Sequence, residues 1–224
     1  MRIGIIGSGG VGQTLAAGFA AKGHEVILGA RDPKANLAVA TPNAMGQPPL
    51  SAWAKANPKV RIATFADAAK HGEVLVFAVK GEQSGSAIKA AGAENMAGKL
   101  VLDTTNPLAF GANGIHKAAA IQDSCLETAQ RAAPKANFVK AWNCTPSSQM
   151  VDPKFKEGRA DQLICGNDAK AKEQATKILK DFGWNVVDAG DATIAPYVEA
   201  TAIAICNYAM KSNDWTWAMK LVRQ

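Results

Sequence analysis

Short apolar runs alternate with segments of helical periodicity along most of this 224-residue chain. Residues 74–79 form a continuous apolar run, which is typical of a parallel strand buried on both faces. The helical segments between such runs place apolar residues three or four positions apart. This alternation predicts an α/β fold with a doubly wound, mostly parallel sheet. Its strands are expected at residues 3–6, 26–28, 60–64, 74–79, 100–103 and 138–142.

A glycine-rich turn joins the first predicted strand to the first predicted helix. Residues 7–12 read Gly-Ser-Gly-Gly-Val-Gly, which is the G-x-G-x-x-G spacing in the strand-to-helix context that it requires. Gly7 allows a tight turn, Gly9 lets the backbone approach a pyrophosphate, and Gly12 lets the helix pack closely on the strand. The N-terminus of the helix favours bound phosphate. We predict a Rossmann-type dinucleotide site that includes Gly7, Ser8, Gly9, Gly10, Val11 and Gly12.

The residues after the second strand bear on the choice between NAD and NADP. An acidic residue there would bind the ribose 2′-hydroxyl, whereas an arginine would accommodate a 2′-phosphate. Asp32 has the expected distance from the glycines, but Gly29 and Ala30 occupy the end of the strand, where the acid normally lies. Arg31 and Lys34 therefore favour NADP. Asp32 has a second interpretation, as a helix or turn cap before a proline, and whether it permits use of NADH stays open.

Further cofactor contacts are expected where later strands end. The fourth strand lies across the switch point from the first, so its carboxyl end should line the cofactor crevice. This makes Ala78, Val79 and Lys80 candidate contacts, although Lys80 is equally well explained as a surface residue. Asn106 and Asn143 follow later strands, and their amides could bind the nicotinamide half, although Asn106 before a proline also suits a turn.

The strand and helix signals continue beyond the dinucleotide-binding part. Two more strands are predicted at 163–165 and 184–187 around a helix at 169–181, and a further helix is predicted near 197–210. We expect a dinucleotide-binding domain at 1–145, with a smaller C-terminal α/β part at 146–224 that carries a helical extension and packs on it. Glycines mark 109–114 as a flexible loop that could cover a second ligand.

Composition narrows the partners and the location. The formal net charge is +6, but the basic residues are scattered, which argues against nucleic-acid binding. Only two residues precede the first strand, which leaves no room for a signal peptide, and the longest apolar stretch is interrupted by polar residues. We therefore expect a cytoplasmic protein that does not enter a membrane. Four widely spaced cysteines predict reduced thiols and no metal site: Cys125, Cys144, Cys165 and Cys206.

Several stretches together resemble the NADPH-dependent deazaflavin (coenzyme F-420) reductases. Relatives of these enzymes include the cytosolic domain of six-transmembrane ferric reductases. The resemblance implies that Ser8, Arg31 and Lys34 hold the 2′-phosphate, with Ala30 where the family has a serine. A second departure is Asp191-Ala192, where deazaflavin reductases tend to have Pro-Leu beside the second ligand. The resemblance rests on residues 5–12, 23–26, 29–31, 103–108, 124–143, 165–168 and 188–190.

The resemblance implies hydride transfer between NADPH and a deazaflavin or flavin, which needs no catalytic acid or base from the protein. One alternative is a non-catalytic NADP(H)-binding sensor or oligomerisation module. Another is a reductase of a small carbonyl or imine, for which Cys144 or Tyr197 would have to donate a proton, although buried structural roles are expected for both. We also expect a homodimer, because the last helix is apolar and Trp215 and Trp217 have little chain left to cover them.

Overall fold

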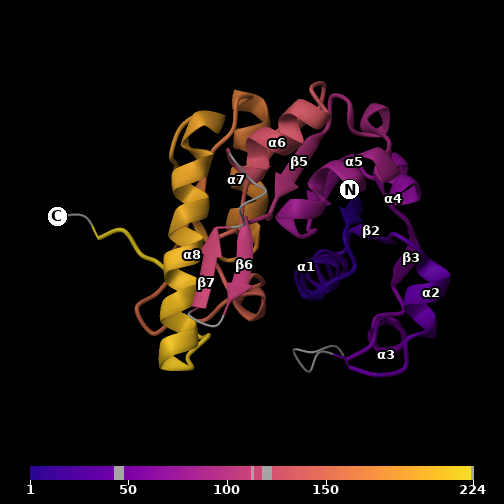
Figure 1. Cartoon of the computed structure of the whole chain (residues 1–224), viewed down its shortest axis with the longest axis horizontal. Coiled ribbons are helices and arrows are strands. Elements are labelled where there is room, and N and C mark those ends of the chain that lie inside the picture. The colour runs from indigo at the N-terminus through magenta and orange to yellow at the C-terminus, as the bar shows by residue number, and fades with distance from the viewer. Residues whose placement is uncertain (43–47, 112–113, 118–122, 223–224) are drawn as a thin grey trace.

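The computed structural model of the chain describes residues 1–42, 48–111, 114–117 and 123–222. The strands of its main sheet are β1 (Arg2–Ile6), β2 (Glu25–Ala30), β3 (Val60–Thr64), β4 (Val74–Phe77), β5 (Leu100–Asp103) and β8 (Asn137–Lys140). All six are parallel and lie in the order β3-β2-β1-β4-β5-β8 (Figure 1). The order reverses between β1 and β4, which is the switch point of a doubly wound sheet. The predicted fold class is confirmed.

Helices cover both faces of this sheet. One face packs against α1 (Gly10–Ala21), α3 (Leu50–Ala56) and α7 (Ala169–Asp181). The other packs against α4 (Phe65–His71), α5 (Ser84–Ala91), α6 (Cys125–Ala132) and α8 (Ala195–Ser212). Because side chains alternate along a strand, Ile3 and Ile5 enter the first layer and Ile6 enters the second. Among the described residues, the other helices are α2 (Pro33–Ala38) and four short 3-10 helices, η1 (Gly81–Gln83), η2 (Ala93–Met96), η3 (Ser147–Gln149) and η4 (Ala192–Ile194).

The last two predicted strands form a separate small sheet. Strands β9 (Asp161–Ile164) and β10 (Asn185–Asp188) pair in parallel, and an antiparallel bridge between Lys140 and Cys165 joins them to β8. The hydrophobic core nevertheless runs through both parts of the chain. The ring of Phe182 lies 4.6 Å from that of Phe19 and 5.3 Å from that of Trp142, centroid to centroid. The division at residue 145 stays a prediction.

The prediction of a flexible loop at 109–114 is wrong for the residues of this segment that the structure describes. Residues 108–111 and 114–117 are the strands of an antiparallel hairpin, β6 (Leu108–Gly111) and β7 (Gly114–Lys117), and residues 112–113 lie outside the described part. The hairpin lies beside α8 (Figure 1), where the Asn207 side chain accepts from the Ile115 N–H at 3.0 Å and donates to its carbonyl at 2.7 Å. An amide side chain from a helix far along the chain thus stabilises a strand that the local sequence does not predict.

Two glycines of the glycine-rich turn have different steric surroundings. A Cβ on Gly12 would lie 1.9 Å from the Gly7 carbonyl oxygen, so α1 and the turn approach more closely than any side chain permits. Gly7 itself has φ of +129°, a conformation that favours glycine. A Cβ on Gly9 would meet nothing within 4 Å. The fold therefore requires Gly12, whereas it leaves the space beside Gly9 open.

We predict that two alanine substitutions in this turn differ in their effect on stability. Gly12→Ala should lower the free energy of unfolding by about 1–3 kcal/mol, since the backbone must shift to admit the methyl group. Gly9→Ala should change it by less than about 0.5 kcal/mol. Urea denaturation followed by circular dichroism measures both, and equal effects would contradict the close approach at Gly12.

Candidate functional site

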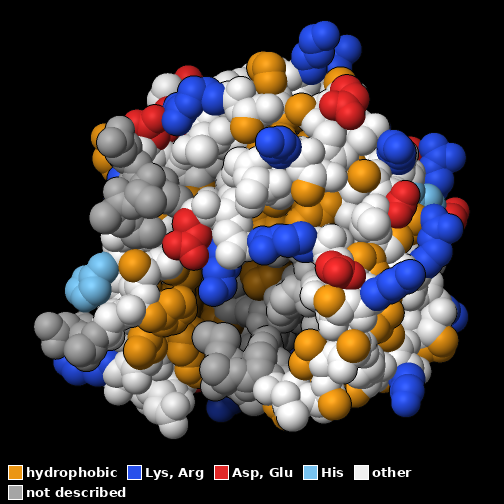
Figure 2. Space-filling view, turned by 45° about the vertical axis from the view of Figure 1, so that its right-hand side comes forward, with side chains coloured by type: hydrophobic (Ala, Val, Ile, Leu, Met, Phe, Trp, Pro, Cys, Tyr) orange, Lys and Arg blue, Asp and Glu red, His pale blue; other side chains and the backbone are white. Residues whose placement is uncertain are grey.

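A crevice lies at the carboxyl ends of β1, β4 and β5, where an open α/β sheet binds its ligands. It consists of adjoining pockets that share Gly9. The largest, called here the hairpin pocket, has a volume of about 480 Å³, within the range of small-molecule sites. Figure 2 shows one face of the molecule, on which a hollow is bordered by hydrophobic and by Lys or Arg side chains. The hairpin pocket is lined by residues 9–11, 78–82, 104, 106 and 108–110.

The second pocket, called here the Arg31 pocket, continues the crevice past the glycine-rich turn. Its volume is about 330 Å³, and it shares Gly9, Ala78, Val79 and Lys80 with the hairpin pocket. It also brings together Gly7, Ser8, Arg31 and two residues that the sequence analysis did not single out, Asn36 and Gln83. The crevice thus joins most of the predicted cofactor residues into one continuous surface.

The turn between these pockets fits a pyrophosphate. No side chain caps the N-terminus of α1, so the first N–H groups of the helix have no partner within it. Gly9 leaves the space in front of them open, and the Gln13 amide donates to the Ser8 carbonyl at 2.8 Å, which fixes the turn. The Asn36 amide donates to the Ser8 hydroxyl at 3.2 Å. These groups form a preorganised anion site.

Side chains after β2 divide into two groups. The Arg31 guanidinium points to the Arg31 pocket, where its Nη2 donates to the Gln83 Oε1 at 2.7 Å. The Asp32 carboxylate accepts from the Ala35 N–H at 3.0 Å and caps α2, as the second interpretation of Asp32 expected. Lys34 is exposed on α2 and is not among the residues that line the crevice. Arg31 is therefore the better placed of the two predicted phosphate ligands.

The two predicted asparagines lie in different positions. Asn106 lines the hairpin pocket, whereas Asn143 is buried behind it. The Asn106 Nδ2 donates to the Asn143 carbonyl at 2.7 Å, and the Asn143 Nδ2 donates to the Asn106 Oδ1 at 3.1 Å and to the Val198 carbonyl at 3.2 Å. A primary amide has two N–H donors and two acceptor sites, so Asn106 keeps one of each for a ligand. Asn143 orients Asn106.

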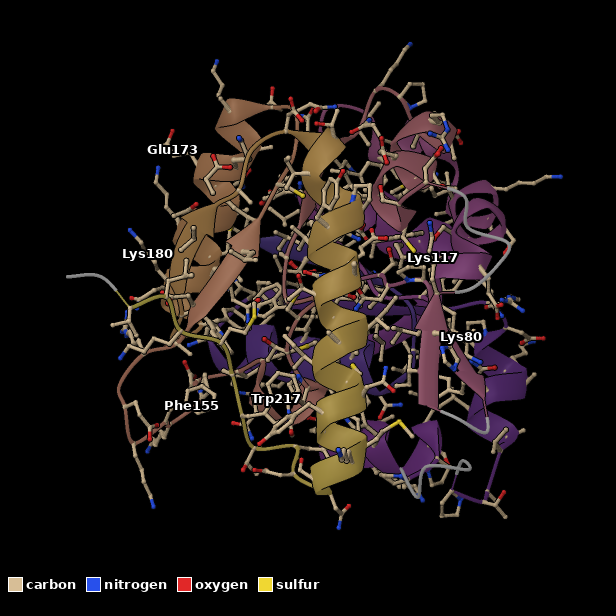
Figure 3. All side chains as sticks on the ribbon, turned by 60° about the vertical axis from the view of Figure 1, so that its left-hand side comes forward. Lys80, Lys117, Phe155, Glu173, Lys180 and Trp217 are labelled. Carbon is tan, nitrogen blue, oxygen red and sulfur yellow. The ribbon has the colours of Figure 1, made fainter. Side chains whose placement is uncertain are left out.

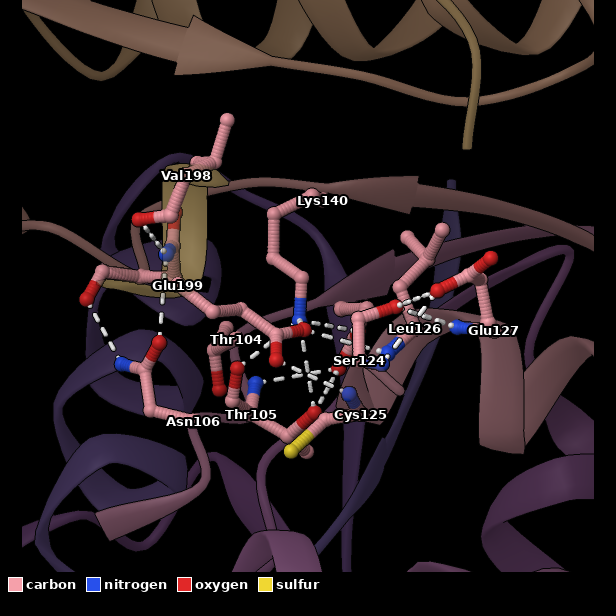
Figure 4. Close-up of polar contacts among 12 residues, drawn as sticks. Thr104, Thr105, Asn106, Ser124, Cys125, Leu126, Glu127, Lys140, Val198 and Glu199 are labelled. Atoms are coloured by element: carbon pink, nitrogen blue, oxygen red, sulfur yellow. Dashed lines mark hydrogen bonds and ion pairs between the residues drawn. The ribbon is translucent and has the colours of Figure 1, made fainter. Parts of the chain in front are cut away.

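A fully buried group of charges supports this wall of the pocket (Figure 4). The Lys140 ammonium lies 2.6 Å from the Asp103 Oδ2 and 2.7 Å from the Glu199 Oε1, and all three side chains are at most 1% exposed. It also donates to the Thr105 carbonyl at 2.8 Å, while the Asp103 Oδ1 accepts from the Thr105 N–H at 2.9 Å. These contacts fix the segment that leads from β5 to Asn106.

The N-terminus of α6 balances the second carboxylate. The Glu199 side chain accepts from the Cys125 N–H at 2.8 Å and from the Leu126 N–H at 3.1 Å, where the helix dipole favours negative charge. Burial alone would lower the pKa of Lys140, but the attraction of Asp103 and Glu199 outweighs it and raises the pKa above the usual range. Lys140 is therefore charged at neutral pH.

Cys144 and Tyr197 were the candidates for proton transfer, and both were expected to be buried. Cys144 is buried, and its thiol donates to the Val198 carbonyl at 3.2 Å, as a structural role requires. Burial raises the pKa of Cys125, Cys144 and Cys165 to about 12, so none is a thiolate nucleophile. Tyr197 is 71% exposed, so the prediction that it is buried is wrong. It lies on a face of α8 that is exposed in the described part of the chain, together with Ala200, Ala204 and Tyr208.

The described residues contain no group of three or more His, Cys, Asp or Glu side chains able to hold a metal ion. Within the same ranges, no helix combines the length and hydropathy needed to cross a membrane.

The buried charges generate a prediction about stability. Lys140→Met should lower the free energy of unfolding by about 3–5 kcal/mol, because it leaves two buried carboxylates without their cation. Lys177→Met is the matched control, since Lys177 pairs with Glu173 at 2.7 Å on the exposed surface of α7 and should contribute at most about 0.5 kcal/mol. Chemical denaturation at neutral pH measures both. A loss below 1 kcal/mol for Lys140→Met would show that water screens these charges.

The chain is similar to known oxidoreductases over its whole length. The family described as NADP oxidoreductase, coenzyme F-420-dependent, matches residues 2–107. A solved structure from an Arthrobacter species, itself assigned only provisionally as an F-420-dependent NADP reductase, is 38% identical, with full coverage of both chains and a TM-score of 0.91.

More distant relatives share the fold with less sequence identity. The metalloreductase STEAP3 of Rattus norvegicus is 25% identical over 205 residues, which are 91% of this chain but only 37% of that protein. The imine reductase of Streptomyces aurantiacus is 18% identical, with a TM-score of 0.61 over 95% of this chain and 64% of the other. At that level of identity the similarity shows the fold alone.

Proposed function

The chain belongs to the family of coenzyme F-420-dependent NADP oxidoreductases, and from this premise we propose that it transfers a hydride between NADP(H) and a deazaflavin or flavin coenzyme. The observation that carries the proposal is the lining of the hairpin pocket. No tyrosine, histidine or cysteine is among its described lining residues, and its titratable side chains, Lys80 and Glu82, are exposed to solvent. Hydride transfer between two stacked rings needs no proton donor from the protein.

The shape and polarity of the same pocket suit a planar second ring. Leu108, Ala109 and Phe110 of β6 all line this pocket, and the side chain of Phe110 is 64% exposed. Such an exposed aromatic side chain can stack on a flat heteroaromatic ligand. Lys80, which lies near the β6–β7 hairpin in Figure 3, lines the pocket and is exposed, and its charge favours an anionic coenzyme.

The roles of the cofactor residues follow from the geometry of the crevice. The N–H groups of the turn at Gly9, Gly10 and Val11 would hold the pyrophosphate, and Arg31 would hold the 2′-phosphate. The free donor and acceptor of Asn106 match a carboxamide, while Ala78 and Val79 give the ring an apolar surface. When bound, the nicotinamide supplies or accepts the hydride. The protein contributes positioning and the exclusion of water.

Substitution of Arg31 tests the cofactor part of the proposal. Arg31→Ala should weaken NADPH binding by about 10- to 150-fold, since a charged hydrogen bond contributes about 1.5–3 kcal/mol, and it should leave NADH binding unchanged. Lys34→Ala is the control, because Lys34 carries the same charge but does not line the crevice. Fluorescence titration with both cofactors measures the affinities. Equal affinities of the unsubstituted protein for NADPH and NADH would contradict NADP selectivity.

Turnover tests the acceptor part of the proposal. The NADPH complex is mixed in a stopped-flow instrument with a deazaflavin, with a flavin or with a small cyclic imine. NADPH should be oxidised by the deazaflavin or the flavin and not by the imine. Oxidation only by the imine would favour the carbonyl or imine reductase. Tight NADPH binding without turnover on any acceptor would favour the non-catalytic sensor.

We propose that the protein is a cytoplasmic homodimer that associates through the free face of α8. Tyr197 and Tyr208 on this face are 71% and 59% exposed, with Ala200 and Ala204 between them at helical spacing. Trp217, which the sequence analysis expected at the interface, is instead partly buried and lines a pocket with Phe155 (Figure 3). The free thiols of the four cysteines support a reducing compartment.

The oligomeric state gives a direct test of this interface. Light scattering should give twice the mass of one chain for the unsubstituted protein and a single-chain mass for Tyr208→Glu, since a carboxylate would be buried without a partner. Lys211→Glu places the same charge at the exposed end of α8 and should stay dimeric. A single-chain mass for the unsubstituted protein would contradict the dimer.

A further inference from the structure

We propose that Gln83 is a determinant of NADP selectivity, which acts by holding the Arg31 guanidinium in place with a neutral partner. This inference rests on the proposed binding of NADPH in the crevice, and it assigns a role to a residue far from the motif that binds dinucleotides. Gln83 and Arg31 are 52 residues apart in the chain and meet in the Arg31 pocket.

The backbone that carries the Gln83 side chain is fixed by hydrogen bonds. Gln83 is the last residue of η1 and precedes α5, and its N–H donates to the Lys80 carbonyl at 2.9 Å while its carbonyl accepts from the Ser86 hydroxyl at 2.9 Å. Its side chain is half-buried, whereas Arg31 is exposed. The short contact of 2.7 Å therefore joins a long surface side chain to a fixed point on the wall of the crevice.

The neutral charge of Gln83 is the second part of the argument. Within the described ranges Arg31 forms no ion pair, although the Asp32 carboxylate lines the same pocket, where it accepts from the Ala35 N–H. No carboxylate in the described part of the chain therefore occupies the N–H donors of the guanidinium. The guanidinium has five N–H donors, and the bond to Gln83 uses one of them, so a 2′-phosphate can bind without displacing the amide.

This arrangement lowers the cost of binding the phosphate. Immobilising a long side chain on binding costs about 0.5–1.5 kcal/mol, and Gln83 has already restricted Arg31 before the ligand arrives. A glutamate at the same place would restrict Arg31 equally well, but its charge would compete with the phosphate and repel it. The advantage of glutamine is that it orders the arginine and leaves its charge uncompensated.

Two substitutions separate ordering from charge. Gln83→Ala should weaken NADPH binding by about 2- to 12-fold, which is the lost ordering expressed as affinity. Gln83→Glu should weaken it by about 100-fold at low salt, with a smaller effect as ionic strength rises. Neither should change NADH binding, which has no 2′-phosphate. Gln174→Glu makes the same change of charge on the exposed side of α7, outside the crevice, so it is the matched control and should not change the ratio of NADPH to NADH affinity.

Repeating these titrations in Arg31→Ala protein makes the inference falsifiable. If Gln83 acts through Arg31, Gln83→Ala should have no further effect in that background, and Gln83→Glu should keep only the repulsion of the phosphate. Equal losses of NADPH and NADH affinity would mean that Gln83 only supports the shape of the crevice, and an unchanged NADPH affinity in Gln83→Glu would also overturn the inference. If Arg31→Ala leaves the NADPH affinity intact, the proposed cofactor selectivity itself fails.

Discussion

The wall of the hairpin pocket depends on one buried cation. Lys140 lies without exposure between Asp103 and Glu199, so its ammonium cannot be removed without leaving two carboxylates in the interior. The three side chains come from β8, β5 and α8, and Glu199 also receives two N–H groups of α6. Four elements from separate parts of the chain are thus fixed relative to one another, at the place where the chain leaves β5 toward Asn106. Positioning within the crevice originates in this cluster.

The two ends of the crevice are built by different means. The hairpin pocket rests on buried ion pairs and hydrogen bonds, whereas the Arg31 pocket uses surface side chains that are ordered by single hydrogen bonds. Segment η1 connects the two, because Lys80 lines both pockets and Gly81 packs tightly beneath them. A Cβ on Gly81 would lie 2.5 Å from the Cys125 Sγ and 2.6 Å from the Asn106 carbonyl oxygen. A shift of Gln83 that alters cofactor binding would therefore also affect Asn106 and the wall of the hairpin pocket.

Local chemistry explains which features could be predicted from the sequence. The glycine-rich turn and the buried strand at β4 are each decided by residues near one another in the chain, and both are present. Asn36 and Gln83 carry no such local signal, since their role arises only where α2 and η1 meet the turn. The hairpin was missed for the same reason, because Asn207 stabilises it from α8. The partnership of Lys140 with Glu199 spans a similar distance and cannot be derived from spacing.

The raised pKa values of the buried thiols affect how readily the protein is oxidised by reactive redox compounds. With a pKa of about 12, on the order of one in 10⁵ of the Cys125, Cys144 or Cys165 side chains is ionised at neutral pH. Peroxides and electrophiles react with the thiolate, so these cysteines are poor targets for oxidative damage. Under the proposed function, a protein that passes electron pairs between coenzymes would therefore not lose electrons from its own thiols, and these thiols would stay reduced for as long as the fold stays closed.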